Sequence, residues 1–145
     1  MDDKKIKRGI FTMINVIYGL KGSGKTNKII DKAHWRAAAT NGSIVYITDR
    51  PEHSREIDKT IRFINIKEYG IDSEKTLLAF IKGLFAGNYD ITDVYIDGPA
   101  KFVKSDVADM EEFYKGIDAV SVTFKADFTV TVSVEEVPDY MKKYI

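Results

Sequence analysis

The sequence contains no cysteine among its 145 residues. Disulfide bonds, thiolate nucleophiles and cysteine zinc ribbons are therefore excluded. Histidine is scarce as well, because only His34 and His53 are present, and they are too few and too far apart to indicate a metal cage. No apolar run approaches the roughly 20 residues that a membrane-spanning helix needs. These absences set aside the disulfide-bonded, zinc-binding and transmembrane classes of protein.

Neither sign of charge is in excess. The 22 basic and 22 acidic residues cancel, so no overall field attracts a polyanion, and nucleic acid is not indicated as a partner. The charged N-terminus is followed by an apolar stretch, 10–18, which runs directly into a glycine-rich loop without a small-residue cleavage site. We therefore do not interpret it as a secretory signal, and we expect a cytoplasmic protein that does not engage membranes.

The length and the composition, with 44% hydrophobic and 30% charged residues, favour one compact domain. We expect this domain to span 13–145, with 1–12 as an N-terminal extension that need not be ordered. Short apolar segments rich in β-branched residues predict five strands, at 13–18, 44–48, 62–66, 91–97 and 128–134. The third of them is expected to be peripheral.

Segments of helical period separate these strands. They predict helices at 24–40, at about 50–58, at 72–88 and at 105–124, with a tail or short helix at 140–145. The segment 119–134 also alternates as a β-hairpin would, but the three-to-four spacing that continues from Val107 favours a helix up to residue 124. Strands alternating with helices imply right-handed crossovers and a mostly parallel five-stranded sheet covered on both faces. The predicted fold is a three-layer α/β/α sandwich.

The segment GLKGSGKT satisfies the phosphate-loop pattern G-x-x-x-x-G-K-[ST] in full. Its glycines let the backbone curl towards phosphate oxygens, and successive N–H groups bind the anion together with the N-terminus of the following helix. Lys25 should reach the β- and γ-phosphates, and the Thr26 hydroxyl should bind Mg²⁺. A simple glycine turn is the alternative, but a buried strand, a glycine loop and an amphipathic helix are the context that the mechanism requires. The residues predicted to bind the nucleotide are Gly19, Leu20, Lys21, Gly22, Ser23, Gly24, Lys25 and Thr26.

Asp97 follows the buried run 94–96 and so ends a predicted strand, at the edge where α/β sheets bind ligands. Downstream of a phosphate loop, an aspartate there is placed to hold Mg²⁺ as a Walker B residue, although capping of the next turn is the alternative. Many ATPases have a catalytic glutamate at the next position, which is Gly98 here, so hydrolysis must use another base or be slow. No Asn-Lys-x-Asp segment for reading guanine is present, and ATP is the expected nucleotide.

Two acidic residues after the second predicted strand, Asp49 and Glu52, are the candidate catalytic bases. The alternative, which we favour, is that both cap the short helix that follows. Arg50 and Arg55 are candidate phosphate contacts on the same segment, and each is also an ordinary surface position.

Four further residues are weaker candidates. Ser133, at the end of the last predicted strand, is a candidate γ-phosphate sensor or an ordinary serine at the edge of the core. Lys21 adds a positive charge inside the loop, and we expect it to face solvent. His34 and the adjacent Trp35 lie off the apolar face of their helix, which favours a partner contact over catalysis. His53 lies between two arginines, a grouping that suggests a second anionic ligand.

The chain from residue 13 to residue 145 resembles a group of small bacterial ATP-binding proteins of uncharacterised role, which consist of a phosphate-loop core and little else. The segments that carry the resemblance are VIYGLKGSGKT, RFINIKEYGIDS, VYIDG and the closing KKYI. Such proteins are sometimes labelled as relatives of twitching-motility ATPases. The layout is also similar to the core of type II thymidine kinases, which have Asp-Glu in place of Asp97-Gly98. By analogy we expect a RecA-like strand order, with the last strand between the 13–18 strand and the Asp97 strand.

Three functions are compatible with these features. The first is a slow or partner-stimulated ATPase that uses its nucleotide state as a switch, with a protein partner or a second copy of the chain supplying missing groups. The second is a nucleotide-binding adaptor that does not hydrolyse ATP. The third is a small-molecule or nucleoside kinase, which would need an acceptor pocket. We rank them in that order.

Overall fold

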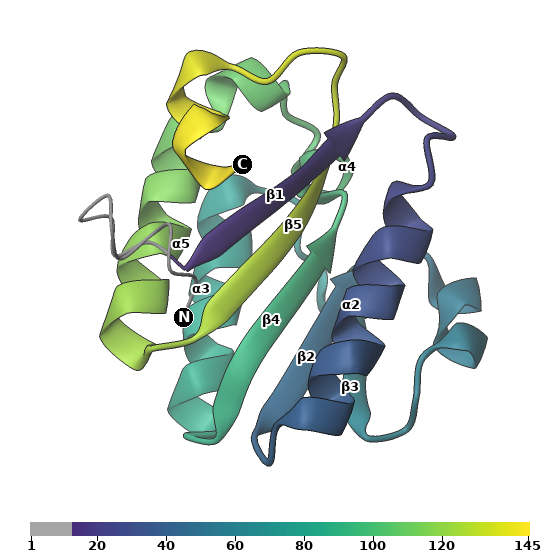
Figure 1. Cartoon of the computed structure of the whole chain (residues 1–145). Helices are drawn as coiled ribbons and strands as arrows, with labels where there is room; N and C mark the ends of the chain where they lie inside the picture. The colour runs from purple at the N-terminus through teal and green to yellow at the C-terminus, as the bar shows by residue number, and fades with distance from the viewer. Residues whose placement is uncertain (1–12) are drawn as a thin grey trace.

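The computed structural model describes residues 13–145, and the expected extension 1–12 lies outside the described residues. Strands and helices alternate along the chain, and the strands form one five-stranded, all-parallel sheet (Figure 1). The strands are β1 (Ile14–Gly19), β2 (Ser43–Thr48), β3 (Ile61–Asn65), β4 (Ile91–Asp97) and β5 (Asp127–Ser133). The α-helices are α2 (Lys25–Ala39), α3 (Glu74–Gly87), α4 (Pro99–Val103) and α5 (Glu111–Phe124). The 3₁₀ helices are η1 (Pro51–Glu56), η2 (Ile66–Tyr69), η3 (Val107–Asp109) and η4 (Asp139–Tyr144).

The strand order is β1-β5-β4-β2-β3. The chain leaves β1, crosses over the positions of β5 and β4 to reach β2 and β3, and then returns through β4 to β5, which lies beside β1. Right-handed crossovers that run in opposite directions along a sheet place their helices on opposite faces, so the helices after β3 lie on the other face from α2. The expectations that β5 separates β1 from β4 and that β3 lies at an edge are confirmed.

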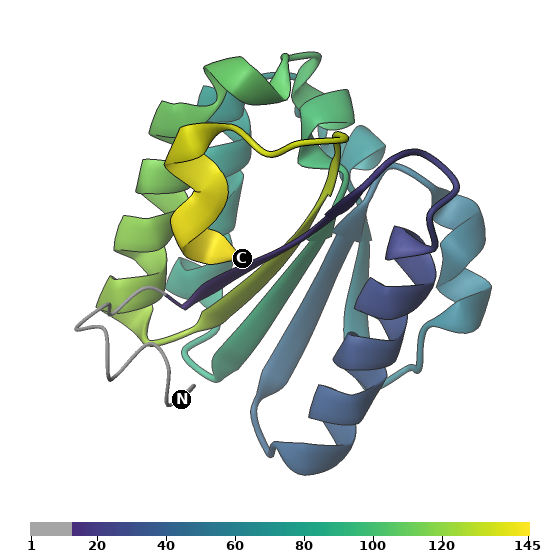
Figure 2. The same cartoon turned by 45° about the horizontal axis from the view of Figure 1, so that its top comes forward.

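Two apolar cores of unequal size hold the layers together. The helix α2, with η1 beside it, lies on one face of the sheet, whereas α3, α5 and η4 lie on the other (Figure 2). The smaller core joins α2, through Ile29 and Ile30, to Tyr46 and Tyr95 of the sheet. The larger core includes Leu77 and Ile81 of α3 and most of the apolar side chains of β4 and β5. The central strands β5, β4 and β2 are buried on both faces, and in β2 this burial appears in the sequence as the continuous apolar run IVYI.

The predicted long helix at 105–124 is wrong at its beginning. The backbone of Met110 is not helical, and it separates the 3₁₀ turn η3 from α5. Apolar positions three residues apart suit both a 3₁₀ turn and an α-helix, so periodicity alone could not locate this break. Glu111 and Glu112 then begin α5, where acidic side chains favour a helix N-terminus. The helix continues to Phe124, which rules out the hairpin alternative.

The short helix α4 was not predicted. It follows Asp97 directly, with Gly98 as its N-cap and Pro99 as its first residue, and it buries Phe102 and Val103. Proline suits the first helical position because its missing N–H would have no intrahelical partner there.

No helix among residues 13–145 is both long enough and apolar enough to cross a membrane.

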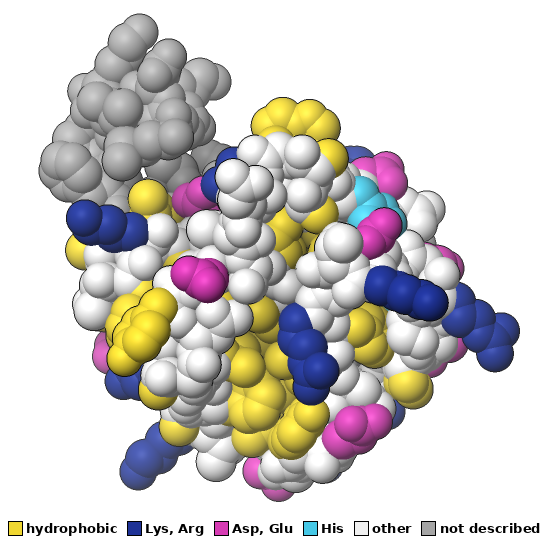
Figure 3. Space-filling view, turned by 90° about the horizontal axis from the view of Figure 1, so that it is seen from below, with side chains coloured by type: hydrophobic (Ala, Val, Ile, Leu, Met, Phe, Trp, Pro, Cys, Tyr) yellow, Lys and Arg dark blue, Asp and Glu magenta, His cyan; other side chains and the backbone are white. Residues whose placement is uncertain are grey.

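Figure 3 shows the end of the molecule where the strands begin. Hydrophobic side chains are visible there between charged side chains of both signs, and outside the grey atoms no continuous basic surface is visible on this face. The opposite end of the sheet, where the strands finish, carries the side chains that the sequence singles out.

Candidate functional site

The loop between β1 and α2 is shaped by its glycines. Gly22 and Gly24 have φ angles of +84° and +89°, a region that residues with a Cβ atom rarely adopt. Gly24 is also the N-cap of α2 and provides no capping side chain. The first N–H groups of the helix therefore face the loop without the side-chain acceptor that most helices place there.

The first turn of α2 is electrostatically unusual. It contains Lys25 and Lys28 and no acidic residue. A helix N-terminus carries about half a positive charge, so cations are unfavourable there and anions are favourable. Two lysines at a helix N-terminus are locally unfavourable, and such an arrangement is typical of a functional site, where a ligand supplies the negative charge that the sequence does not. The loop and the start of α2 together form a site suited to a phosphate or a similar oxyanion.

The Lys25 side chain folds back over this loop. Its Nζ donates a hydrogen bond to the backbone carbonyl of Leu20 at 2.9 Å, and the residue is only 9% exposed. Burial lowers the pKa of Lys25, while the charge of Asp97 opposes this change and Lys101 adds to it. The ammonium group is thus held in a place where its charge is only partly balanced. An anionic ligand in the loop would complete the balance.

Thr26 and Asp97 meet although 71 positions separate them in the sequence. The Thr26 hydroxyl donates to Asp97 Oδ2 at 3.0 Å, which joins the start of α2 to the end of β4. The predicted juxtaposition of these two residues is therefore present in the structure. Asp97 is 9% exposed, so little of it is open to solvent.

Two further hydroxyls hold the Asp97 carboxylate. Thr131 of β5 donates to Oδ1 at 2.5 Å, and Tyr46 of β2 lies 3.4 Å from Oδ2. Burial raises the pKa of Tyr46, and the charge of Asp97 raises it further, so the phenol remains a neutral donor. The Thr131 oxygen also accepts a hydrogen bond from the Gly98 N–H at 2.8 Å. Neighbouring strands on both sides of β4 thus fix the orientation of one carboxylate.

Gly98 occupies the position at which many ATPases have a glutamate. Its φ angle is +72°, a left-handed conformation that costs a non-glycine residue about 1–2 kcal/mol. A glutamate at this position would therefore be strained. A carboxylate at residue 98 would thus carry a cost in backbone strain, although a Cβ atom there would meet only Lys101 at an ordinary contact distance of 3.9 Å.

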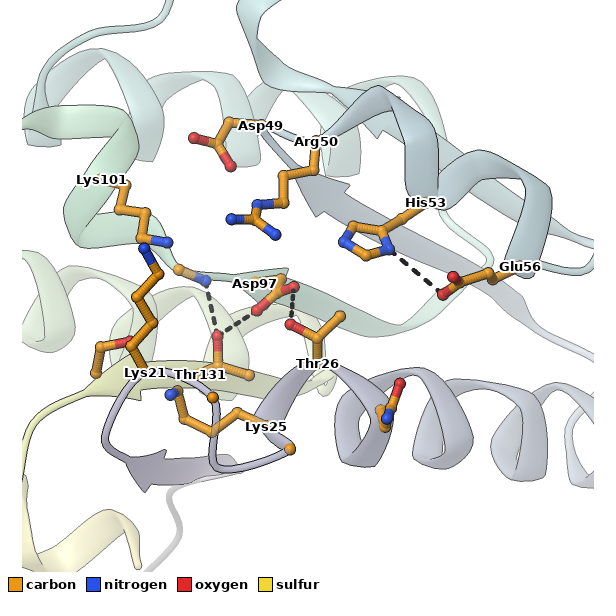
Figure 4. Close-up of a pocket in the computed structure, with 15 residues that line it drawn as sticks. Lys21, Lys25, Thr26, Asp49, Arg50, His53, Glu56, Asp97, Lys101 and Thr131 are labelled. Atoms are coloured by element: carbon orange, nitrogen blue, oxygen red, sulfur yellow. Dashed lines mark hydrogen bonds and ion pairs between the residues drawn. The ribbon is translucent and has the colours of Figure 1, made fainter.

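An open cavity of about 430 Å³ lies over these groups. Figure 4 shows its labelled side chains, with Lys25, Thr26 and Asp97 on one side and Asp49, Arg50 and His53 facing them. The basic residues that line it are Lys21, Lys25, Arg50 and Lys101, and the acidic ones are Asp49, Glu56 and Asp97. Five of the eight predicted loop residues line the cavity, whereas Gly19, Leu20 and Ser23 do not. Lys21, which we expected to face solvent, borders the cavity although it is exposed.

The segment after β2 divides into two groups. Asp49, Arg50 and His53 line the cavity, but Glu52 and Arg55 are exposed and lie outside its lining. Of the two predicted bases, only Asp49 is therefore near the loop. The reason is that η1 is a tight 3₁₀ helix, in which residues three apart share a face. His53 and Glu56 consequently share the cavity face.

Two other candidates have distinct environments. Ser133, the predicted sensor, lines the cavity at the end of β5. His34, by contrast, lies away from it and accepts a hydrogen bond at Nε2 from the Asp58 N–H at 3.1 Å, which ties α2 to the chain beyond η1. Trp35 is 71% exposed on the outer surface of α2.

Sequence reasoning missed Thr131, Glu56 and Lys101. Thr131 belongs to a strand of alternating threonines and valines, and nothing in that pattern distinguishes it from Thr129. Lys101 lies on the unpredicted α4, and Glu56 could be found only by recognising the 3₁₀ period after Pro51. Each is brought to the site by tertiary structure.

A second cavity of about 310 Å³ adjoins the first. It shares Gly98, Lys101, Thr131 and Ser133 with the first cavity, and the remaining lining is largely apolar. The residues found only in this second cavity are Ala100, Ser105, Asp106, Val107, Tyr114, Val132 and Val134.

Among residues 13–145, no group of three or more His, Asp or Glu side chains is arranged to hold a metal ion. Mg²⁺ does not require such a cage, because it usually keeps several waters and binds one or two protein oxygens together with substrate phosphates. The Thr26 hydroxyl and the Asp97 carboxylate are oxygen ligands of this kind, placed 3.0 Å apart. The donor set fits Mg²⁺ that arrives with a phosphate ligand.

No protein-family model matches the chain, and a search of curated proteins finds no significant match. Function is therefore inferred from the side chains and their geometry.

Proposed function

We propose that the chain is a P-loop protein that binds Mg-ATP at Gly19–Thr26 and acts as a slow or partner-stimulated ATPase, with its nucleotide state serving as a switch. The observation that carries this proposal is the contact between Thr26 and Asp97 at 3.0 Å. A phosphate-loop threonine and an aspartate at the end of a nearby strand are the pair that binds Mg²⁺ in proteins of this class. A simple glycine turn would not require Thr26 to contact Asp97, so this contact favours the phosphate-binding interpretation of the loop.

The sheet supports the same proposal. A strand lies between β1 and β4, as expected for a RecA-like P-loop NTPase fold. The helix after β1, α2, and the helix after β5, η4, lie on opposite faces of the sheet (Figure 2), and such a switch between neighbouring strands leaves a crevice at their carboxyl ends, where open α/β sheets bind ligands. The absence of a glutamate at residue 98 favours slow turnover, or turnover that depends on groups from a partner or a second copy of the chain.

Calorimetry with Mg-ATP and Mg-GTP, combined with a phosphate-release assay, tests the proposal. We expect Mg-ATP to bind, and Lys25→Ala to weaken binding roughly 10- to 100-fold because a charged contact to phosphate is lost. Lys28→Ala is the matched control, since Lys28 lies in the same first turn of α2 but is exposed and does not line the cavity. Equal affinity of Lys25→Ala and wild type, or no binding of either nucleotide, would contradict the proposal.

The second cavity favours one alternative, a small-molecule kinase. It adjoins the Lys101 side of the phosphate cavity and has an apolar lining with Ser105 and Asp106 as polar groups, which suits a small organic acceptor. ADP release that depends on an added acceptor would support the kinase. Nucleotide binding without release of phosphate, whatever acceptor is added, would instead support the non-hydrolysing adaptor.

A further inference from the structure

We propose that His53 and Glu56 form the pair that accepts the proton from the attacking water, with His53 as the catalytic residue and Glu56 as the positioning residue. This inference rests on the proposed function, because it assigns the base that the Asp97-Gly98 edge does not provide. The glutamate position is occupied by a glycine at φ +72°, so the base must come from another part of the cavity.

The candidates for that base are the cavity residues that can accept a proton. Asp49 and the pair His53 and Glu56 line the wall that faces Thr26 and Asp97 (Figure 4). The ring of His53 is held by a third group, Glu56, and a base oriented by a third group is the common arrangement in acid–base catalysis. The imidazole is therefore the better-matched group.

Contact with Glu56 orients the imidazole. His53 Nδ1 lies 3.3 Å from Glu56 Oε2. An ionised carboxylate only accepts hydrogen bonds, so the contact places the ring proton on Nδ1 and leaves the lone pair on Nε2. In Figure 4 the other ring nitrogen, Nε2, is on the side of the ring turned away from Glu56 and towards the cavity.

The environment of Nε2 supports the assignment. Nε2 is buried and has no hydrogen-bond partner among the described residues, and the side chain is 16% exposed. A buried polar atom without a partner costs about 1–3 kcal/mol, and such atoms are rare outside sites that a ligand or water completes. Less than 1 Å² of Nε2 is accessible, so the side chains around it must shift as the nucleotide enters; a water between Nε2 and the terminal phosphate would then satisfy this atom.

The step balances without any further reactant. The water oxygen forms a bond to the γ-phosphorus, and the bond from that phosphorus to the oxygen bridging to the β-phosphate breaks, so ADP leaves with the electron pair. The water proton passes to His53 Nε2, and the Glu56 carboxylate stabilises the imidazolium that results. Solvent then takes the proton from His53, which restores the pair.

Single-residue variants in the full chain test the pair. We expect His53→Ala to keep its affinity for Mg-ATP within about twofold and to lose roughly 100-fold in kcat, the usual contribution of a general base. His53→Gln should behave in the same way, and it keeps a polar side chain if the alanine variant folds poorly. Glu56→Gln should lower kcat by a smaller factor. Ser54→Ala is the matched control on η1, because Ser54 is exposed and does not line the cavity.

Added imidazole supplies a readout that a structural role would not change. It should restore part of the activity of His53→Ala and none of that of Lys25→Ala. The assignment of His53 and Glu56 would be overturned if His53→Ala kept the wild-type kcat or lost only affinity for ATP. It would also be overturned if imidazole restored no activity. Wild-type chain that binds Mg-ATP and releases no phosphate would also overturn it, while leaving nucleotide binding intact. Wild-type chain that binds no nucleotide would be a failure of the proposed function itself.

Discussion

At the scale of single residues, the site is organised around the orientation of one carboxylate. Asp97 receives hydrogen bonds from Thr26 on α2, Tyr46 on β2 and Thr131 on β5. Thr131 also accepts a hydrogen bond from the Gly98 N–H, which ties the end of β5 to the start of α4. A buried carboxylate held by neutral hydroxyls can be fixed in direction while its charge remains available to a cation.

Replacing Thr131 by valine should therefore affect both stability and nucleotide binding. The side chain keeps its shape, but Asp97 Oδ1 and the Gly98 N–H both lose a partner, which should cost about 1–3 kcal/mol of the free energy of unfolding. Urea unfolding measures this loss, and calorimetry should show weaker binding of Mg-ATP. Thr129→Val is the control, since Thr129 is also buried on β5 and lies two residues away on the same face of the strand. Equal behaviour of the two variants would contradict the role of Thr131.

The residues of the site differ in how far the sequence could predict them. Gly19–Thr26 forms a contiguous pattern, and Asp97 ends an apolar run, so both could be located along the chain. Thr131 and Glu56 could not, because their roles depend on which strands are neighbours and on the period of a six-residue 3₁₀ helix. Local patterns identify groups that act through their own backbone, whereas supporting side chains arrive through tertiary contacts.

At the scale of elements, the sequence predicts the buried segments well and predicts the type and the beginning of a helix less well. The strand expected within 91–97 is present as β4, and it could be located because its buried apolar run 94–96 is followed directly by Asp97. The helix at 105–124 was predicted too long, since a spacing of three residues is shared by 3₁₀ and α-helices. Hydrophobic periodicity reports burial well and reports the type of helix poorly.

The C-terminal helix η4 should make stability sensitive to alkaline pH. Burial raises the pKa of Tyr140 and of Tyr144 to about 12, and it also raises that of Tyr114 on α5, which stacks with Tyr144. In the unfolded chain a tyrosine titrates near about 10. The folded state therefore holds these phenol protons more tightly, and the contribution is complete below about pH 10 and is lost as the pH rises towards 12.

Urea unfolding between about pH 8 and pH 11, with tyrosinate absorbance measured in parallel, checks this expectation. The free energy of unfolding should decrease above pH 10, and the decrease should be smaller for Tyr144→Phe, which has no phenol proton to lose. A decrease of the same size in Tyr144→Phe and wild type would show that other groups cause the alkaline loss.

At the scale of the whole molecule, the path of the chain explains where the site lies. The chain reverses its direction across the sheet so that β5 enters between β1 and β4. The loop after β1, the aspartate that ends β4 and the threonine of β5 thereby meet at one edge. The cavity is bordered on its other side by η1, which follows β2. A ligand bound there would contact segments from both halves of the chain and should stabilise the fold as a unit.

Mg-ATP should accordingly raise the melting temperature of the whole domain. A ligand that binds only the folded state stabilises it by about 2.7 kcal/mol at 100 times its Kd, which corresponds to roughly 5–10 °C for a domain of this size. Thermal unfolding followed by circular dichroism measures the shift. Chelating Mg²⁺ should reduce it, because Thr26 and Asp97 would no longer share a cation with the phosphates. Lys25→Ala should show at most about half of the wild-type shift at the same concentration if it binds 10- to 100-fold more weakly, whereas a full shift in that variant would mean that ATP binds away from the Gly19–Thr26 loop.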